Sequence, residues 1–308
     1  MPRFPSIPQL SIVVPVTDDV AAFESSLVSV LENRPERSEI IVPHNGSYND
    51  PFDLSDEVRF VEAKDDGLVE LVQQSAGQAR GRYVHVVAEG VLATPNWSEP
   101  AIEKLDNPEL GFVAPVIRQP QGHVLACGWT DTPHRLCHPV ASGHPEAEPG
   151  ETVRAIGAYL QASFWRRDLL RSMSKAFRGD LAQEANYAYG LLARHAGWRG
   201  SVATDSVMQF NASELPWDQS TLDRGRRLRA IQHQLRGGGW GTAITAGLRS
   251  ATACLTGQIA ISEAIGQATA PLADAEVELL LFVGETMSPD DYDATIRLPA
   301  QIAARRAA

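Results

Sequence analysis

Cysteine is scarce in this chain, and its few cysteines follow no metal-binding or disulfide pattern. There are three, Cys127, Cys137 and Cys254, among 308 residues. They form no Cys-x-x-Cys pair, and an odd count does not match the disulfide framework of a small secreted domain. The sequence therefore does not predict a secreted, disulfide-stabilised protein.

Long apolar runs and an excess of positive charge are also missing. No stretch approaches the roughly 18 consecutive apolar residues of a membrane-spanning helix. Pro2 and Pro5 interrupt the segment where a signal peptide would need an apolar helix. The formal net charge is −11, which argues against a groove that binds nucleic acid. We therefore expect a cytoplasmic protein without a nucleic-acid partner.

What the chain does have is a series of short apolar runs that alternate with helical patterns. The first run, residues 10–16, leads directly into a helical pattern over residues 20–32. Such units are typical of an α/β fold with an open parallel sheet, where ligands lie outside the carboxyl ends of the strands. Because no Gly-x-Gly-x-x-Gly follows the first run, a dinucleotide-dependent oxidoreductase is disfavoured. Further strands are predicted at residues 39–42, 58–61, 83–87, 111–116 and 202–204, and further helices at residues 68–79 and 185–195.

The composition changes near residue 215, where we place a domain boundary. Residues 221–236 are rich in arginine, and residues 240–272 have helical spacing and almost no charge. We therefore predict one domain over residues 1–214 and a helical C-terminal extension over residues 215–308. We expect the apolar helix to pack on the main domain or on a partner subunit of a homo-oligomer. A peripheral membrane contact through residues 221–272 is a second interpretation.

Four segments of the chain together resemble the nucleotide-sugar domain of the inverting glycosyltransferases of family two, which have the GT-A fold. They are residues 11–16, residues 39–47, residues 79–84 and residues 191–199, in the family's order. The resemblance covers roughly residues 8–212. It implies a Rossmann-like, mostly parallel sheet flanked by helices. It also implies transfer of a sugar from a UDP-sugar or similar donor to a glycan or small-molecule acceptor.

The resemblance places the nucleoside beside the ends of the first two strands. Pro15, Thr17 and Asp18 follow the first strand, and Asp18 can accept hydrogen bonds from a base or a ribose. Asn45 and Gly46 follow the second strand, where the family usually has an acid. Asn45 keeps a carbonyl acceptor but not the charge. The alternative is that Asp18 and Asn45 cap local turns.

The metal site that the resemblance implies is degenerate here. The family places Asp-x-Asp after a strand like residues 83–87, because Mg²⁺ and Mn²⁺ prefer oxygen ligands. This chain has Ala88, Glu89 and Gly90 at those positions, and strand alternation predicts that Glu89 points to the opposite side. We therefore expect no metal ligand set at this strand end. Glu89 is either a contact to the nucleotide or a solvated loop acid.

The resemblance also implies a catalytic base before the helix that ends at Gly197. An inverting transfer needs a carboxylate there to deprotonate the acceptor hydroxyl. Counting back without a gap reaches Ala185 and Asn186, whereas a slip of one residue reaches Glu184. Asp180 is also near. We take Glu184 as the candidate base, and the alternative is an exposed acid in the first turn of a helix.

Two clusters outside these motifs have competing interpretations. Guanidinium groups bind phosphate in a bidentate manner, so an arginine run can replace the missing metal on the diphosphate, or it can be a solvated helix face. The candidates are Arg224, Arg226, Arg227 and Arg229. Residues 123–144 hold four of the eight histidines and two cysteines. Their spacing matches no zinc motif, so an acceptor-side loop is the favoured interpretation.

The sequence leaves two functions open. One is a nucleotide-sugar-dependent glycosyltransferase, for which Glu184 would be the base. The other is a non-catalytic protein that keeps the fold and a nucleotide or glycan pocket for binding or scaffolding. Loss of the metal and base signatures together favours altered or lost chemistry.

Overall fold

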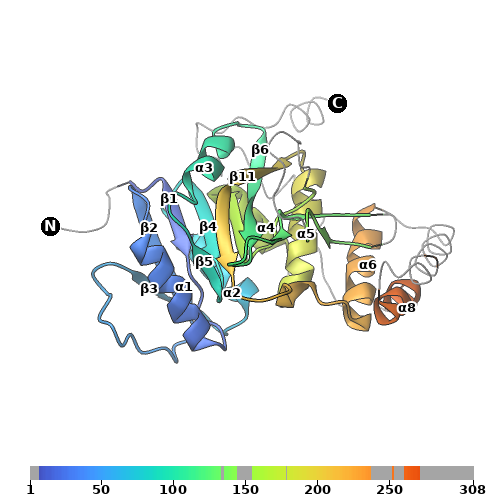
Figure 1. Cartoon of the computed structure of the whole chain (residues 1–308), viewed down its shortest axis with the longest axis horizontal. Helices are drawn as coiled ribbons and strands as arrows, with labels where there is room; N and C mark the ends of the chain where they lie inside the picture. The colour runs from blue at the N-terminus through green and yellow to red at the C-terminus, as the bar shows by residue number, and fades with distance from the viewer. Residues whose placement is uncertain are drawn as a thin grey trace.

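The centre of the molecule is a mixed sheet with helices packed around it (Figure 1). The computed structural model describes residues 7–132, 135–143, 155–177, 179–236, 252 and 260–270. Within them nine strands form one sheet in the order β3-β2-β1-β4-β10-β6-β11-β5, with β7 paired to β6. The strands are β1 Leu10–Val13, β2 Ser38–His44, β3 Arg59–Glu62, β4 Tyr83–Val87, β5 Val91–Ala93, β6 Leu110–Arg118, β7 Val124–Ala126, β10 Ala162–Arg166 and β11 Arg199–Phe210.

The helices fill the connections between these strands. The layer made by α2, α4 and α5 is held together by contacts among the three helices, whereas α1 packs on β5 and α3 packs on β6, β10 and β11. A two-stranded hairpin, β8 Trp129–Thr130 and β9 His138–Pro139, stands apart from the main sheet. The helices are α1 Val20–Glu32, α2 Leu68–Gln78, α3 Glu99–Leu105, α4 Arg167–Ala176, α5 Ala182–His195, the 3₁₀ turn η1 Pro216–Asp218, α6 Leu222–Arg236 and α8 Ile261–Thr269.

The register brings the carboxyl ends of three strands to one edge of the sheet. Val13 of β1 lies opposite Ile41 of β2 and opposite Val86 of β4, and both pairings are parallel. Pro15, Asn45 and Ala88 follow these strands, so they lie at the same edge. We call it the carboxyl edge. The expected α/β fold with a mostly parallel sheet is confirmed.

Some elements differ from the sequence prediction. The strand β10, which is not among the strands predicted from the sequence, is antiparallel and lies between β4 and β6. The last strand, β11, extends to Phe210 because its far end pairs with β5 as well as with β6. The apolar segment predicted over residues 240–272 lies mostly outside the described residues. Within it the structure describes Thr252 and residues 260–270, which include α8. Within the described part of the chain, no helix is long and apolar enough to cross a membrane.

The amino ends of the strands are tied together by one buried carboxylate. Glu39 of β2 is fully buried. It accepts hydrogen bonds from Ser11 Oγ at 2.6 Å, from Arg80 N at 2.7 Å and from Arg80 Nε at 2.8 Å, and Arg59 lies 3.4 Å away. Ser11 Oγ in turn accepts from the backbone N–H of Gly81 at 2.9 Å. Glu39 therefore links β1, β2 and the start of β4.

Helices α6 and α8 form a close pair at the end of the molecule away from β2 and β3 (Figure 1). A Cβ added at Gly266 would lie 2.0 Å from the carbonyl oxygen of Leu222, and one added at Gly225 would lie 2.2 Å from that of Glu263. Real Cβ atoms do not approach backbone so closely, so glycine is required at both positions for these backbones to meet. The domain boundary proposed near residue 215 stays a prediction.

Candidate functional site

The turn after β1 is held in place by backbone pairing and by a helix cap. The N–H groups of Val14 and Val16 donate to the carbonyls of Ile41 and Pro43, each at 2.9 Å. Asp19 then caps α1, since its Oδ1 accepts from the backbone N–H of Ala22 at 3.0 Å. The capping role weighed for Asp18 thus belongs to Asp19, and Asp18 is an exposed residue of the turn.

The turn after β2 uses the side chain of Asn45 locally. Its Oδ1 accepts from Ser47 N at 3.0 Å and from Ser47 Oγ at 2.5 Å, and its Nδ2 donates to Asp66 Oδ2 at 3.2 Å. Gly46 has φ +87°, a conformation that favours glycine. The turn-forming alternative for Asn45 is therefore observed, although the turn itself lies at the carboxyl edge.

Three buried polar atoms at the carboxyl edge have no hydrogen-bond partner. They are Thr17 Oγ1, Tyr48 Oη and Glu89 Oε2. All three residues surround the first turns of α1: Thr17 precedes it, Tyr48 packs edge-on against Phe23 with ring centroids 5.2 Å apart, and Gly90 N, next to Glu89, donates to Ala22 O. A buried polar group without a partner costs about 1–3 kcal/mol. A polar ligand at this edge would remove that cost.

Tyr48 was not among the candidate binding residues predicted from the sequence. Burial, with added effects of the nearby Glu24 and Asp50 carboxylates, raises the pKa of its phenol, so the hydroxyl stays protonated and able to donate. The available signal was a single aromatic residue in the polar stretch after the Asn45-Gly46 turn. Such a residue usually has a packing or binding partner.

Glu89 lies on the side of the β1 turn, which corrects the orientation expected from strand alternation. Burial, followed by the charges of Asp19 and Asp18, raises the pKa of its carboxyl, so the three acids are near one another. The alternation argument failed because β4 ends at Val87 and the next residues form a turn, with Gly90 at φ +76°. Glu89 therefore lies on the same side as the β1 turn, with its Oε2 buried and without a hydrogen-bond partner.

The carboxyl edge does not provide the metal ligands that the family resemblance implies. Ala88 and Gly90 carry no ligand atom, and Asp19 is used as a helix cap. Among the residues that the structure describes, no group of three or more His, Cys, Asp or Glu side chains is placed to hold a metal ion. The residues therefore do not fit the expected Mg²⁺ or Mn²⁺ site, and we derive no catalytic step through a metal.

Glu184 is buried. The alternative interpretation, an exposed acid in the first turn of a helix, is therefore wrong. The Glu184 side chain is 2% accessible, and its Oε1 accepts from Arg227 Nη1 at 2.8 Å. The pair joins the first turn of α5 to α6. A carboxylate enclosed in this way, with a guanidinium bound to it, is badly placed to take a proton from an acceptor hydroxyl.

Counting back from Gly197 without a gap reaches Asn186, and in the structure this residue lies next to the end of β4. Its side chain is an amide, not a carboxylate. Asn186 Oδ1 accepts from Leu160 N at 2.6 Å, and its Nδ2 donates to Gln161 Oε1 at 3.0 Å. The carbonyl of Gln161 accepts from Ala88 N at 2.9 Å. Because an amide cannot act as a general base, the position that the ungapped count assigns to the base has no basic group.

The arginine run does not lie at the carboxyl edge. Helix α6 contacts α5 and α8, and Figure 1 places it at the opposite end of the molecule from β2 and β3. Arg224 is 3% exposed and donates to Asp218 Oδ1 at 2.9 Å and to Glu263 Oε1 at 2.5 Å. This corrects the diphosphate role predicted for Arg224. On the same helix Arg227 binds Glu184, Arg229 donates to Gln232 and Arg226 is partly exposed.

The similarity to known proteins is confined to three-dimensional structure. No protein-family model matches the sequence, and a comparison with curated proteins gives no match. The structure of GalNAc-T7 with UDP, GalNAc and Mn²⁺ superposes with a TM-score of 0.53 at 14% identity, over 72% of this chain and 48% of that chain. The structure of S. aureus TarS with UDP-GlcNAc gives 0.53 at 13% identity, over 85% of this chain and 79% of that chain.

A second TarS structure, in complex with UDP, superposes with a TM-score of 0.52 at 12% identity, over 80% of this chain. This chain spans about half the length of the GalNAc-T7 chain. At these identities the similarity concerns the fold, and membership of family two stays a prediction. The GT-A glycosyltransferase fold expected from the sequence is confirmed.

Proposed function

We propose that this chain is a glycosyltransferase-like protein that binds a nucleotide-sugar at its carboxyl edge. The observation that carries the proposal is the group of three buried polar atoms without partners, Thr17 Oγ1, Tyr48 Oη and Glu89 Oε2. Two hydroxyls and a carboxylate suit the hydroxyls of a ribose and the polar edge of a base. The UDP and UDP-GlcNAc complexes of proteins with the same fold support a uridine nucleotide as the ligand class.

The charge at this edge predicts how the nucleotide binds. Asp18, Asp19 and Glu89 are close together, and the arginine run lies elsewhere. Negative groups repel a diphosphate. The nucleoside half of the donor should therefore supply most of the binding free energy.

Titration calorimetry with uridine, UDP and UDP-GlcNAc tests the proposal. We expect uridine to bind at least as tightly as UDP, and Mn²⁺ to leave the affinity for UDP unchanged because the described residues of the edge provide no metal ligand set. Thr17→Val and Tyr48→Phe should each weaken uridine binding about 5–10-fold, the effect of one hydrogen bond of roughly 1–1.5 kcal/mol. Thr204→Val, a partly exposed site within β11, is the matched control and should bind like the wild type. Absence of binding by all three ligands, or unchanged affinity in both variants, would contradict the proposal.

A specific observation favours the non-catalytic form of this function. The base position holds the amide of Asn186, and Glu184 is paired with Arg227. We therefore infer that the protein binds a donor without the carboxylate base of an inverting transfer, as a binding or scaffolding protein would.

The variant Glu184→Gln distinguishes a catalytic glycosyltransferase from a non-catalytic binding protein. It should leave any rate of UDP-sugar hydrolysis or transfer unchanged, because the carboxylate serves to hold α5 against α6. It should lower the free energy of unfolding by about 1–3 kcal/mol, the cost of losing a charged partner in a buried pair. A rate that falls tenfold or more in a variant that remains folded would identify Glu184 as the base and restore the catalytic interpretation.

A further inference from the structure

A second polar cavity lies beside the β8–β9 hairpin, apart from the residues proposed to bind the donor. Its volume is about 330 Å³, at the lower end of the roughly 300–1,000 Å³ of ligand pockets. It is bounded by β7, by the hairpin and by the segment that follows β11. We call it the hairpin cavity. Its polar lining residues are Arg135, His138, Ser142, Ser213, Glu214, Asp218, Gln219 and Ser220.

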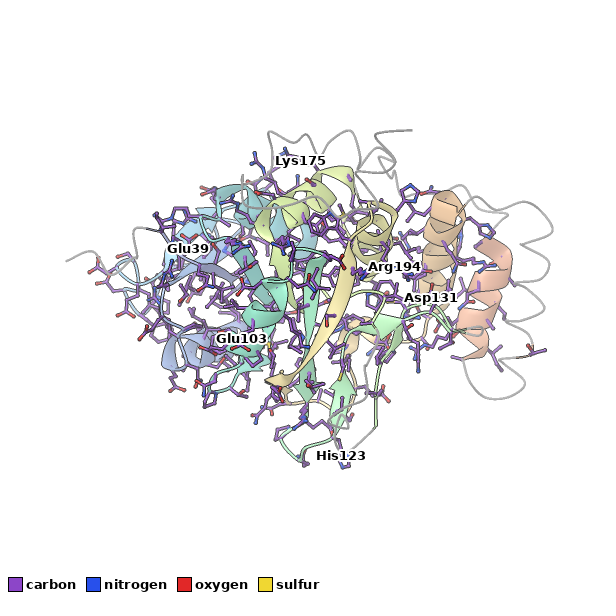
Figure 2. All side chains as sticks on the ribbon, turned by 90° about the horizontal axis from the view of Figure 1, so that it is seen from above. Glu39, Glu103, His123, Asp131, Lys175 and Arg194 are labelled. Carbon is purple, nitrogen blue, oxygen red and sulfur yellow. The ribbon has the colours of Figure 1, made fainter. Side chains whose placement is uncertain are left out.

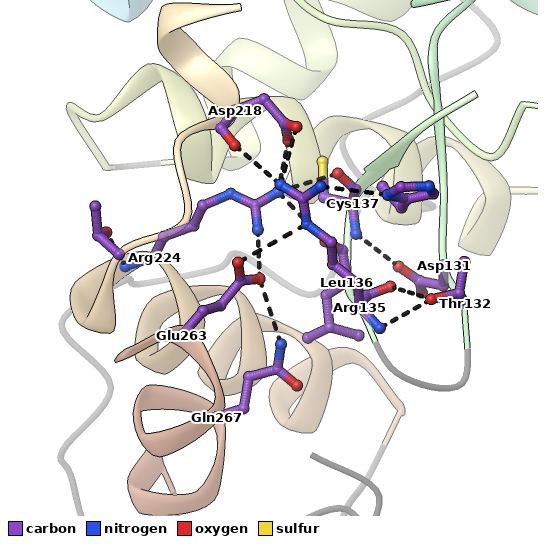
Figure 3. A network of polar contacts seen from close by, with 11 residues as sticks. Asp131, Thr132, Arg135, Leu136, Cys137, Asp218, Arg224, Glu263 and Gln267 are labelled. Atoms are coloured by element: carbon purple, nitrogen blue, oxygen red, sulfur yellow. Dashed lines mark hydrogen bonds and ion pairs between the residues drawn. The ribbon is translucent and has the colours of Figure 1, made fainter. Parts of the chain in front are cut away.

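Two of these lining residues are fixed by buried charges behind them (Figure 3). Arg135 Nη2 donates to the carbonyl and to Oδ2 of Asp218, each at 2.9 Å. Asp218 Oδ1 accepts from Arg224, and Arg224 is bound in turn to Glu263, which is fully buried. A wall held in this way loses little conformational entropy when a ligand binds.

His138 gives the cavity a neutral hydrogen-bonding group. Its Nδ1 lies 3.3 Å from Arg135 Nη1. A guanidinium can only donate, so Nδ1 accepts and Nε2 carries the proton of the neutral ring. Burial, together with the positive charges of Arg135 and Arg224, lowers the pKa of this imidazole. The ring is therefore uncharged at neutral pH.

The charges of the lining exclude an anionic ligand. Among the described lining residues Arg135 is the single positive group, it is balanced by Asp218, and Glu214 adds a further negative charge. The remaining polar groups are three hydroxyls, an amide and the neutral imidazole of His138. Such a mixture of donors and acceptors without a net positive charge matches a ligand with many hydroxyls and no charge.

We propose that the hairpin cavity is a binding site for a neutral saccharide. Asp218 accepts from sugar hydroxyls, Arg135 and the Nε2–H of His138 donate to them, and the serine and glutamine side chains complete the contacts. The site goes beyond donor binding at the carboxyl edge and is formed by other residues. Its occupation therefore does not require that a nucleotide-sugar bind.

Saturation-transfer NMR and calorimetry with defined probes test this site. The neutral probes are N,N′-diacetylchitobiose and maltose, and the anionic comparators are glucuronate and inorganic phosphate. We expect at least one neutral probe to bind the wild-type protein in preference to both anions. Gln219→Trp should weaken that binding tenfold or more, because the indole fills the cavity from an exposed position.

Gln121→Trp is the matched control, since Gln121 is also exposed and lies outside the cavity lining. It should bind the saccharide like the wild type, and Gln219→Trp should keep the uridine affinity of the wild type. A folded Gln219→Trp protein that binds the saccharide unchanged would overturn the proposal. So would preference for either anion, or no binding of either neutral probe. A wild-type protein that binds a neutral saccharide but not uridine would refute donor binding at the carboxyl edge and would leave the saccharide site unaffected.

Discussion

Replacing Arg224 by methionine is expected to lower the free energy of unfolding by about 3–5 kcal/mol, the usual cost of removing one partner from a buried ion pair. Arg224 is 3% exposed and donates to Asp218, to Glu263 and to the carbonyl of Cys137 at 3.0 Å. Without it, the partners of the Glu263 carboxylate that remain among the described residues are Arg135, 3.8 Å away, and the Nε2 of Gln267. Urea denaturation measures the effect, and limited proteolysis shows whether α8 separates.

Two further variants distinguish a buried charge from lost packing. Arg226→Met lies on the same helix at a partly exposed position, so it should change stability by less than about 0.5 kcal/mol, as surface substitutions usually do. The double variant Arg224→Met/Glu263→Met should recover more than half of the loss, because an apolar pair of similar volume often replaces a buried ion pair at little cost. A single variant that costs less than about 1 kcal/mol would show that this charge network does not hold α6 and α8.

The carboxyl edge could be predicted from the sequence because its causes are local. Parallel strands must place their carboxyl ends together, so short Val- and Ile-rich runs that end in polar turns were enough to place Pro15, Asn45 and Ala88 at one edge. The register of β1 with β2 and β4 confirms this placement. What each side chain binds at that edge was less predictable. Asn45 and Asp19 are used by their own turns, which only the geometry of the turns decides.

Neither interpretation of the arginine run anticipated the partners of Arg224 and Arg227, because these partners are distant in the sequence. Arg224 meets Glu263, 39 positions along the chain, and Arg227 meets Glu184, 43 positions back. One signal was present: Glu263 is the only charged residue between Arg249 and Asp274. A lone carboxylate among apolar residues is rarely buried without a partner. Basic residues upstream should therefore have been considered as that partner before a diphosphate.

The candidate base shows a different limit of sequence spacing. A slip of one residue in the count decided whether Glu184 or Asn186 was assigned to this position. Glu184 and Asn186 lie in the same helix turn, yet one contacts α6 and the other contacts the backbone beside β4. Residues two apart on a helix face different directions. Sequence spacing gave the right helix, and only the direction of each side chain shows that an amide lies at the sheet.

Glu39→Gln is expected to lower the free energy of unfolding at neutral pH by about 2–3 kcal/mol, because the charged hydrogen bonds from Arg80 become neutral ones. Burial acts to raise the pKa of Glu39, but the hydrogen bonds from Ser11 and Arg80 and the charge of Arg59 outweigh it and lower the pKa below its ordinary value. A depressed pKa in the folded state means that the carboxylate contributes stability above its unfolded pKa of about 4.3. That contribution is lost as the pH falls through the folded pKa.

The difference between wild type and Glu39→Gln should therefore shrink as urea denaturation is repeated from neutral pH down toward about pH 3, where carboxylates become protonated. Glu103→Gln is the matched control: this residue is exposed on α3 (Figure 2), and its substitution should change stability little at any pH. A Glu39→Gln difference that stays constant with pH would mean that shape, not charge, matters at this position. The strand ends opposite the carboxyl edge are held by the ionised form of Glu39, so acid should loosen the link between β1, β2 and β4 before it affects the apolar core.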